Sequence, residues 1–175
     1  MSDPRYPIGK FQYPDTPVSP EQCAAYIEEI AAAPAQYRAA VAGLDDSQLD
    51  TPYRDGGWTL RQTVHHVADS HINSYVRFRL AATEDNPRIT TYKEELWAEL
   101  ADAKSLPVEV SLVLIESLHE RWVVFLRSLS AGQLARTFDH PANGPLPLST
   151  VLALYAWHGR HHVAHIKTLR TQKGW

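Results

Sequence analysis

Apolar residues recur three and four positions apart over long stretches of this chain of 175 residues, and this spacing constrains the fold most. One side of a helix turns toward a core at that period. The clearest run predicts a long helix and consists of Leu112, Ile115, Leu118, Trp122, Phe125, Leu126 and Leu129. No stretch alternates with period two for long enough to predict a strand. Several long amphipathic helices with short links favour an all-α fold, an antiparallel bundle.

Local signals place the other helices. Ser19 and Pro20 predict the start of a first helix that reaches Gly43, with Pro34 kinking or restarting it. Thr59-Leu-Arg-Gln62 has the pattern of a capping box and predicts a helix to about Ala82. A short helix is expected around 92–100, and the last helix runs from about Ser149 to Arg170. Residues 1–18 carry four prolines and predict an extended arm over the body.

Composition narrows the function classes. The length predicts one domain, 1–175, and the net charge of −3 argues against a nucleic-acid partner, which needs a basic surface. The single cysteine, Cys23, forbids an intrachain disulfide and suits a reducing compartment. No segment reaches the roughly 20 apolar residues that cross a bilayer, so no membrane association is expected. The first residues lack the apolar core of a signal peptide, and we therefore expect a cytoplasmic protein.

The segment "WHGRHHVAHI" places four histidines on the last predicted helix. At about 100° per residue, His158 and His162 fall within the apolar arc of that helix, which also holds Leu148, Val151, Leu152, Tyr155, Ile166 and Leu169. His161 lies well outside this arc and His165 at its edge. Two imidazoles at i and i+4 can hold one metal ion. The pair His158 and His162 is therefore the candidate for metal binding.

Further histidines leave the rest of the site open. The helix from Thr59 carries His65, His66 and His71, and its apolar arc includes His71, places His65 at the margin and turns His66 away. His119 follows Glu116 by three residues, but no second Glu-x-x-His motif exists for a di-iron site. We therefore expect His119 in the core or behind a ligand. His140, in the proline-rich segment "FDHPANGPLPLS", is expected to be exposed.

The segments "YPIGKF", "LDTPYRDGGWTLRQTVHHVADSHINSYVRF" and "LYAWHGRHHVAHI" closely resemble the YfiT branch of the DinB-like superfamily. The resemblance covers nearly the whole chain and implies a four-helix bundle, often a homodimer. It also implies a metal held by three histidines: His66, eight residues after Trp58, and the pair His158 and His162. At His66 the resemblance disagrees with the helical arc, and His65 remains the alternative. His165 would belong to the pocket wall.

Members of this family are described as metal-dependent hydrolases, and some relatives resemble thiol S-transferases. Three neutral imidazoles suit one Zn²⁺ or Ni²⁺ per subunit and leave coordination positions open for water or a thiol. Asp69, three residues after His66, is a candidate base or a partner that orients a ligand.

A small-molecule substrate is expected. The residues expected to line its pocket, besides His165, are Trp58, Tyr155, Trp157 and Arg160. Arg160 and His161, both expected to face outward, would attract an anion. The alternative to a metal-dependent enzyme is a non-catalytic metal-binding bundle that acts in stress response.

Overall fold

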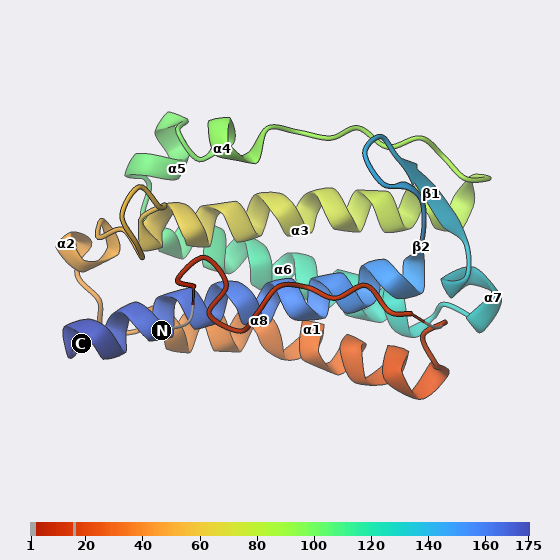
Figure 1. Cartoon of the computed structure of the whole chain (residues 1–175), viewed down its shortest axis with the longest axis horizontal. Coiled ribbons are helices and arrows are strands. Elements are labelled where there is room, and N and C mark those ends of the chain that lie inside the picture. Colours follow the sequence, from red (N-terminus) through yellow and green to blue (C-terminus); the bar gives the residue numbers. More distant parts are fainter. Residues whose placement is uncertain (1–2, 16) are drawn as a thin grey trace.

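Four long helices dominate the computed structural model, which describes residues 3–15 and 17–175 (Figure 1). They are α1 (Pro20–Val41), α3 (Leu60–Thr83), α6 (Val108–Arg127) and α8 (Leu148–Lys173). The short helices are α2 (Asp46–Leu49), α4 (Glu94–Trp97), α5 (Ala101–Ser105) and α7 (Ala131–Leu134). Two short strands, β1 (Thr137–His140) and β2 (Gly144–Pro147), complete the fold. The expectation of a four-helix bundle is confirmed.

The order of the helices around the bundle differs from a simple up-and-down arrangement. Helix α8 packs on α1 and α3, and α6 packs on the same two helices from the other side. The colours in Figure 1 show that α1 and α8 run in one direction and α3 and α6 in the other. The reason is the long connection 84–107, which returns along the outside of the bundle and carries α4 and α5. The prediction of antiparallel helices joined by short links therefore describes only part of this topology.

The predicted helix starts are confirmed by their caps. The Ser19 side chain accepts from the Gln22 amide, and the Thr59 side chain accepts from the Gln62 amide, each in a complete capping box. Helix α1 continues through Pro34 to Val41, so the expected restart at Pro34 is wrong. Packing of α1 against α6 and α8 holds the helix together where one backbone hydrogen bond is missing.

The segment expected to be a loop, "FDHPANGPLPLS", contains an antiparallel hairpin instead. Phe138 pairs with Leu146, and His140 pairs with Gly144 at the turn. Two strands of four residues are too short to show alternation, and the prolines of β2 are tolerated because the sheet has only two strands. Asn143-Gly144 is the turn signal that could have revealed the hairpin. His140 is half-buried there rather than exposed.

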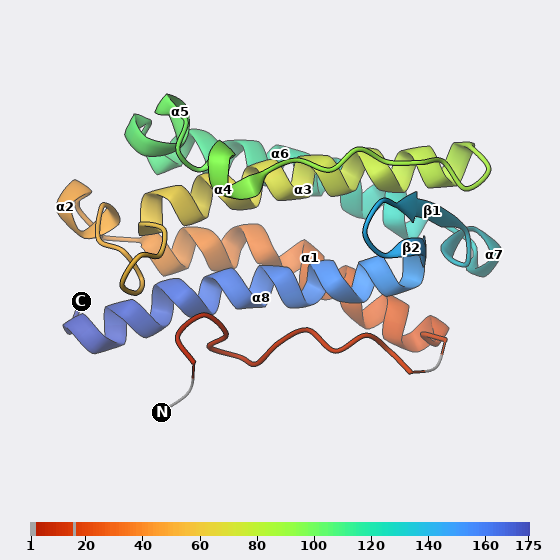
Figure 2. The ribbon, with the colours of Figure 1, turned by 45° about the horizontal axis from the view of Figure 1, so that its top comes forward.

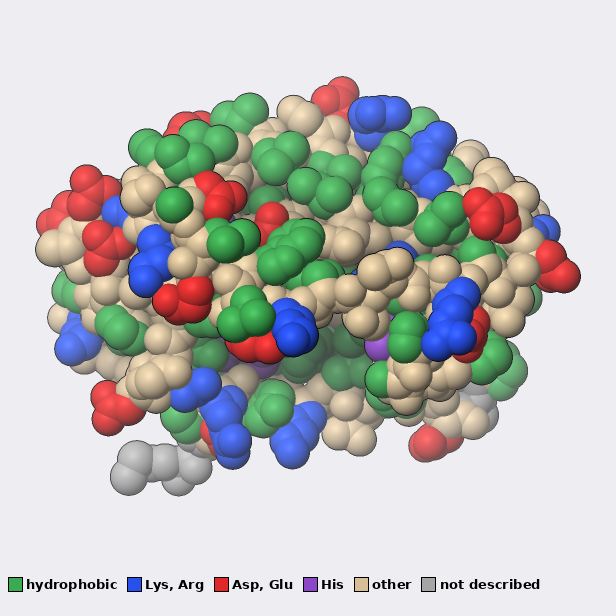
Figure 3. Space-filling model, turned by 90° about the horizontal axis from the view of Figure 1, so that it is seen from above, with side chains coloured by type: hydrophobic (Ala, Val, Ile, Leu, Met, Phe, Trp, Pro, Cys, Tyr) green, Lys and Arg blue, Asp and Glu red, His purple; other side chains and the backbone are tan. Residues whose placement is uncertain are grey.

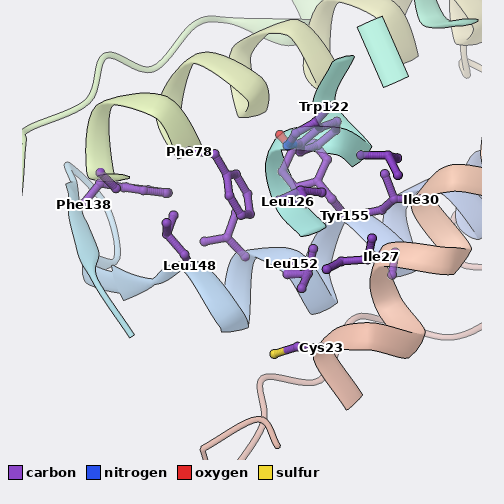
Figure 4. Close-up of a cluster of buried hydrophobic side chains, with 14 of the residues drawn as sticks. Cys23, Ile27, Ile30, Phe78, Trp122, Leu126, Phe138, Leu148, Leu152 and Tyr155 are labelled. Carbon is purple, nitrogen blue, oxygen red and sulfur yellow. The ribbon is translucent and has the colours of Figure 1, made fainter. Parts of the chain in front are cut away.

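Two clusters of buried side chains fill the bundle. One lies near the hairpin end, where Phe78, Trp122 and Tyr155 point into the space between α3, α6 and α8, and Cys23 lies at its margin (Figure 4). The other lies toward the opposite end and includes Tyr37, Val64 and Ile166. The Tyr37 hydroxyl donates to the Gly159 carbonyl at 2.9 Å, which fixes α1 against the turn of α8 that carries the histidines.

The arm before α1 runs in an extended path along α8 (Figure 2). Phe11 packs on Trp157 with ring centroids 5.9 Å apart, and His165 Nε2 donates to the Arg5 carbonyl at 3.3 Å. Residues 1, 2 and 16 of the predicted arm lie outside the described residues. Within the described part of the chain, no helix combines the length and apolar character needed to span a membrane.

Candidate metal centre

Three histidines from two neighbouring helices converge near the middle of the bundle. His66 lies on α3, and His158 and His162 lie one turn apart on α8. Each offers a ring nitrogen, and these three nitrogens all lie within 4.8 Å of one another. The ring centroid of His66 lies 5.5 Å from that of His158 and 5.0 Å from that of His162. The structure therefore brings together the three residues expected to bind a metal.

Burial keeps these imidazoles neutral. Loss of hydration lowers the pKa of His66 to about 4. Burial, followed by the neighbouring histidines, holds the pKa values of His158 and His162 well below their usual range. A neutral imidazole offers a lone pair, whereas an imidazolium cannot bind a cation. All three rings are ready to act as ligands at neutral pH.

The histidines face a cavity of about 490 Å³. Its wall holds aromatic rings, two cationic side chains and two exposed carboxylates: Tyr6, Tyr53, Trp58, Trp157, Arg5, Arg54, Glu94 and Glu95. Trp58 packs on His66 with ring centroids 4.5 Å apart, and His165 stacks on Tyr53 at 4.1 Å. On the face drawn in Figure 3, histidine atoms show only within depressions between other side chains. The site is recessed yet open enough for a small molecule.

A second group of histidines overlaps the first. Nitrogens of His161, His162 and His165 also lie within 4.8 Å of one another, so the two groups share His162. The Nδ1 atoms of these three rings are buried and have no hydrogen-bond partner among the described residues. Buried polar atoms without partners are uncommon. These three rings therefore keep one ring nitrogen each that no described residue engages.

Behind the cavity, His158 is connected to two further imidazoles. His158 Nδ1 lies 3.1 Å from Nε2 of His71 on α3, and His71 Nδ1 lies 2.7 Å from Nε2 of His119 on α6. The expectation that His119 lies in the core or behind a ligand is confirmed. Because Nδ1 of His158 is taken, its Nε2 is the atom left for the cavity.

The alternative ligand His65 faces another part of the molecule. Its Nδ1 lies 2.7 Å from the Ser111 hydroxyl and its Nε2 lies 3.1 Å from the Leu106 carbonyl. Both ring nitrogens are therefore engaged away from the cavity. His66, which the apolar arc of α3 had turned away, is the residue that faces α8. The apolar arc gave the wrong residue because it marks the side of α3 that faces the core, whereas the cavity lies beside that side.

Three of the expected site residues do not line the cavity. Tyr155 is buried in the core, where its hydroxyl contacts Ser70. Arg160 is exposed and pairs with Glu29 of α1. Asp69 is half-buried, and burial followed by the charge of Asp102 raises its pKa to about 6. None of these three residues belongs to the cavity wall, whereas Trp58, Trp157 and His165 lie in it as expected.

His161 is not directed outward as expected. It is buried, stacks on Trp157 with centroids 4.3 Å apart, and lies 6.1 Å from the Tyr6 ring of the arm. The helical arc assumes one buried face, but the arm covers the outer side of α8 at this point. Sequence reasoning also missed the cavity role of Tyr6 and Arg54, because extended arms and loops carry no periodicity that predicts where their side chains point.

The sequence of this chain matches a known protein family. The model of the DinB superfamily matches residues 29–166. Two relatives, from Bacillus cereus and Bacillus anthracis, are 57% identical over 175 residues, cover both chains completely and bear the name "Putative metal-dependent hydrolase". These relatives share the full length of the chain, so the match includes the arm, the cavity loops and the histidine helix.

Solved structures agree with this assignment. YfiT from Bacillus subtilis, described as "a probable metal-dependent hydrolase with an unusual four-helix bundle topology", is 47% identical, with a TM-score of 0.95 over 98% of both chains. The four-helix bundle protein TT2238, at 20% identity and a TM-score of 0.58, covers 87% of this chain and 99% of its own, and shares the fold. The chain therefore belongs to the DinB superfamily.

Proposed function

We propose that this protein is a metal-dependent enzyme in which His66, His158 and His162 hold one divalent ion, Zn²⁺ or Ni²⁺. The observation that carries the proposal is the meeting of three neutral imidazoles, two buried and one (His158) half-buried, at one wall of a cavity of about 490 Å³. The names of the relatives at 57% identity and of YfiT support a metal-dependent hydrolase.

The residues fit such an ion. Imidazole nitrogens suit Zn²⁺ and Ni²⁺, and an ion held by these three histidines would keep coordination positions for a water or a thiol. A structural zinc site would instead be closed by four protein ligands. When bound, the ion would supply Lewis acidity that lowers the pKa of a water toward 7, or deprotonates a thiol.

The chain's own residues would bind and orient the substrate. Trp58 and Trp157 offer apolar faces, while Arg5 and Arg54 offer cationic groups and Glu94 and Glu95 anionic ones at the same cavity. Such a wall suits a small molecule that carries both apolar and charged parts. For hydrolysis, Glu94 and Glu95 are the carboxylates available to accept a proton, since Asp69 does not line the cavity.

One observation favours a second candidate, transfer of a thiol to an electrophile. The two cavity carboxylates are exposed side chains of α4, and among the described residues neither forms a hydrogen bond with a histidine of the site. A thiol that loses its proton on binding a metal ion needs no carboxylate base. The same three histidines would then serve nucleophilic attack by sulfur instead of oxygen.

Turnover assays on the metal-loaded protein test these alternatives. A panel of esters and amides is compared with pairs of a low-molecular-weight thiol and an electrophile, using His66→Ala as the inactive control. Turnover of any ester or amide that disappears in His66→Ala supports the hydrolase. Turnover confined to the thiol pairs replaces it with the transferase, and no turnover in either panel by fully loaded protein contradicts an enzymatic role.

A further inference from the structure

Three imidazoles, of which the inner two are buried, form a continuous line from the candidate metal centre to the backbone of α1. The line runs from His158 to His71 and His119 at the distances given above, and His119 Nδ1 then lies 2.8 Å from the Ile30 carbonyl. His71 is fully buried and His119 is 2% exposed. Three helices, α8, α3 and α6, thus each contribute one ring, and α1 contributes the end point.

The end point is a carbonyl that the helix itself leaves available. In an α-helix, the carbonyl of Ile30 would accept the amide N–H of residue 34. Residue 34 is Pro34, which has no N–H to donate, yet α1 continues unbroken to Val41. His119 Nδ1 lies where it can donate to this carbonyl in place of the missing amide. Pro34 of α1 therefore leaves a hydrogen-bond acceptor free for His119 of α6.

The Ile30 carbonyl sets the direction of every hydrogen bond in the line. A carbonyl can only accept, so His119 Nδ1 carries a hydrogen and donates. The other nitrogen of a neutral ring then accepts, so His71 donates from Nδ1 to His119 Nε2. By the same rule His158 donates from Nδ1 to His71 Nε2. The lone pair of His158 consequently lies on Nε2, the atom left for the cavity.

The surroundings keep the two inner rings neutral. Trp122 packs in T-shaped contact with both rings, with centroid distances of 5.8 Å to His71 and 5.6 Å to His119, and Tyr155 packs in the same way on His71 at 5.2 Å. The hydrogen bonds of both rings are those of the line, which contains no carboxylate. An unpaired imidazolium in such a place would lose its hydration without compensation.

We propose that His71 and His119 are positioning residues that hold His158 in the Nδ1–H tautomer, with the direction set by the Ile30 carbonyl that Pro34 leaves free. The use of the Nε2 lone pair for metal rests on the proposed function, whereas the tautomer does not. The line does not carry protons out of the site, because an amide carbonyl at its far end cannot take up a proton at neutral pH. Its role is to orient.

The tautomer is measured directly in the metal-free protein. Long-range proton–nitrogen correlation spectra of protein labelled with ¹⁵N distinguish Nδ1–H from Nε2–H rings. His158, His71 and His119 should all be Nδ1–H tautomers at neutral pH. An Nε2–H tautomer for His158 overturns the proposal, whether or not the protein binds metal. This measurement needs no variant and so does not depend on a mutant folding.

Variants of His71 test the consequence for metal affinity. His71→Leu removes the acceptor of the His158 hydrogen bond and should weaken Co²⁺ or Zn²⁺ binding about 10–100-fold, as loss of a ligand's partner does elsewhere. His71→Gln, whose amide can accept from His158 and donate to His119, should restore most of the affinity. The matched control is His65→Leu, which removes another buried histidine of α3 that bonds away from the cavity.

The outcomes separate orientation from packing. Equal affinity losses in His71→Leu and His71→Gln, or an equal loss in His65→Leu, contradict a positioning role. Undiminished affinity in His71→Leu contradicts it as well. If the wild-type protein binds no ion at all, the proposed function fails, while the tautomer spectrum still decides this inference.

Discussion

Protonation of His119 should make the metal-free fold sensitive to acid by a predictable amount. Burial lowers the pKa of His119 from 6.5 to about 4, so in the folded protein the ring takes up a proton less readily than in the unfolded chain. Between these two pKa values the unfolded state binds more protons, and stability falls as the pH falls. At about 1.36 kcal/mol per pKa unit, His119 alone accounts for about 3 kcal/mol between pH 7 and pH 4.

The assay is urea unfolding of the metal-free protein at about pH 7 and about pH 4, with His119→Gln beside the wild type. A glutamine can keep both hydrogen bonds but does not titrate, so the variant should lose about 3 kcal/mol less on acidification than the wild type does. Any packing cost of the substitution occurs at both pH values and cancels in this comparison. His140→Gln, on the half-buried hairpin, serves as the control and should keep most of the wild-type loss. Equal losses for the wild type and His119→Gln would refute the reasoning.

Three further changes have defined outcomes. Thr59→Ala removes the side chain that accepts from the Gln62 amide and should lower the free energy of unfolding by about 1 kcal/mol, measured by thermal or urea unfolding. Arg61 is 4% exposed, and its guanidinium donates to Asp46, Asp50 and a backbone carbonyl. Arg61→Met should lower the free energy of unfolding in urea by about 2 kcal/mol, and a loss near zero contradicts a structural role. Zn²⁺ at about 100 times its dissociation constant should stabilise the protein by about 2.7 kcal/mol, seen as a rise in Tm that the variant His162→Ala lacks.

The helices could be predicted from the sequence because their signals are local. The caps at Ser19 and Thr59 combine one side chain with the amide three residues on, and the apolar spacing of α6 reports its buried face directly. The pair His158 and His162 was found for the same reason, since both ligands lie on one helix. The hairpin was missed because four-residue strands give no period, although Asn143-Gly144 marks its turn.

The parts that could not be predicted depend on contacts between distant segments. The helical arc turned His161 outward because nothing in α8 shows that the arm, about 150 residues earlier, covers that side. The arc also favoured His65 over His66, since it locates the central seam and not a cavity beside it. The meeting of His71 with His119 depends on the order of α3 and α6 around the bundle, which the long connection 84–107 determines.

Metal content per chain tests the central claim most directly, because two overlapping groups of histidines share His162. Each variant is loaded with Zn²⁺ or Ni²⁺, dialysed and measured by elemental analysis, with circular dichroism to confirm that the helices remain. We expect one ion per chain in the wild type, in His161→Ala and in His165→Ala, and none in His66→Ala or His158→Ala. Retention of the ion in His66→Ala together with its loss in His161→Ala would contradict the assignment of His66, His158 and His162 as the ligands.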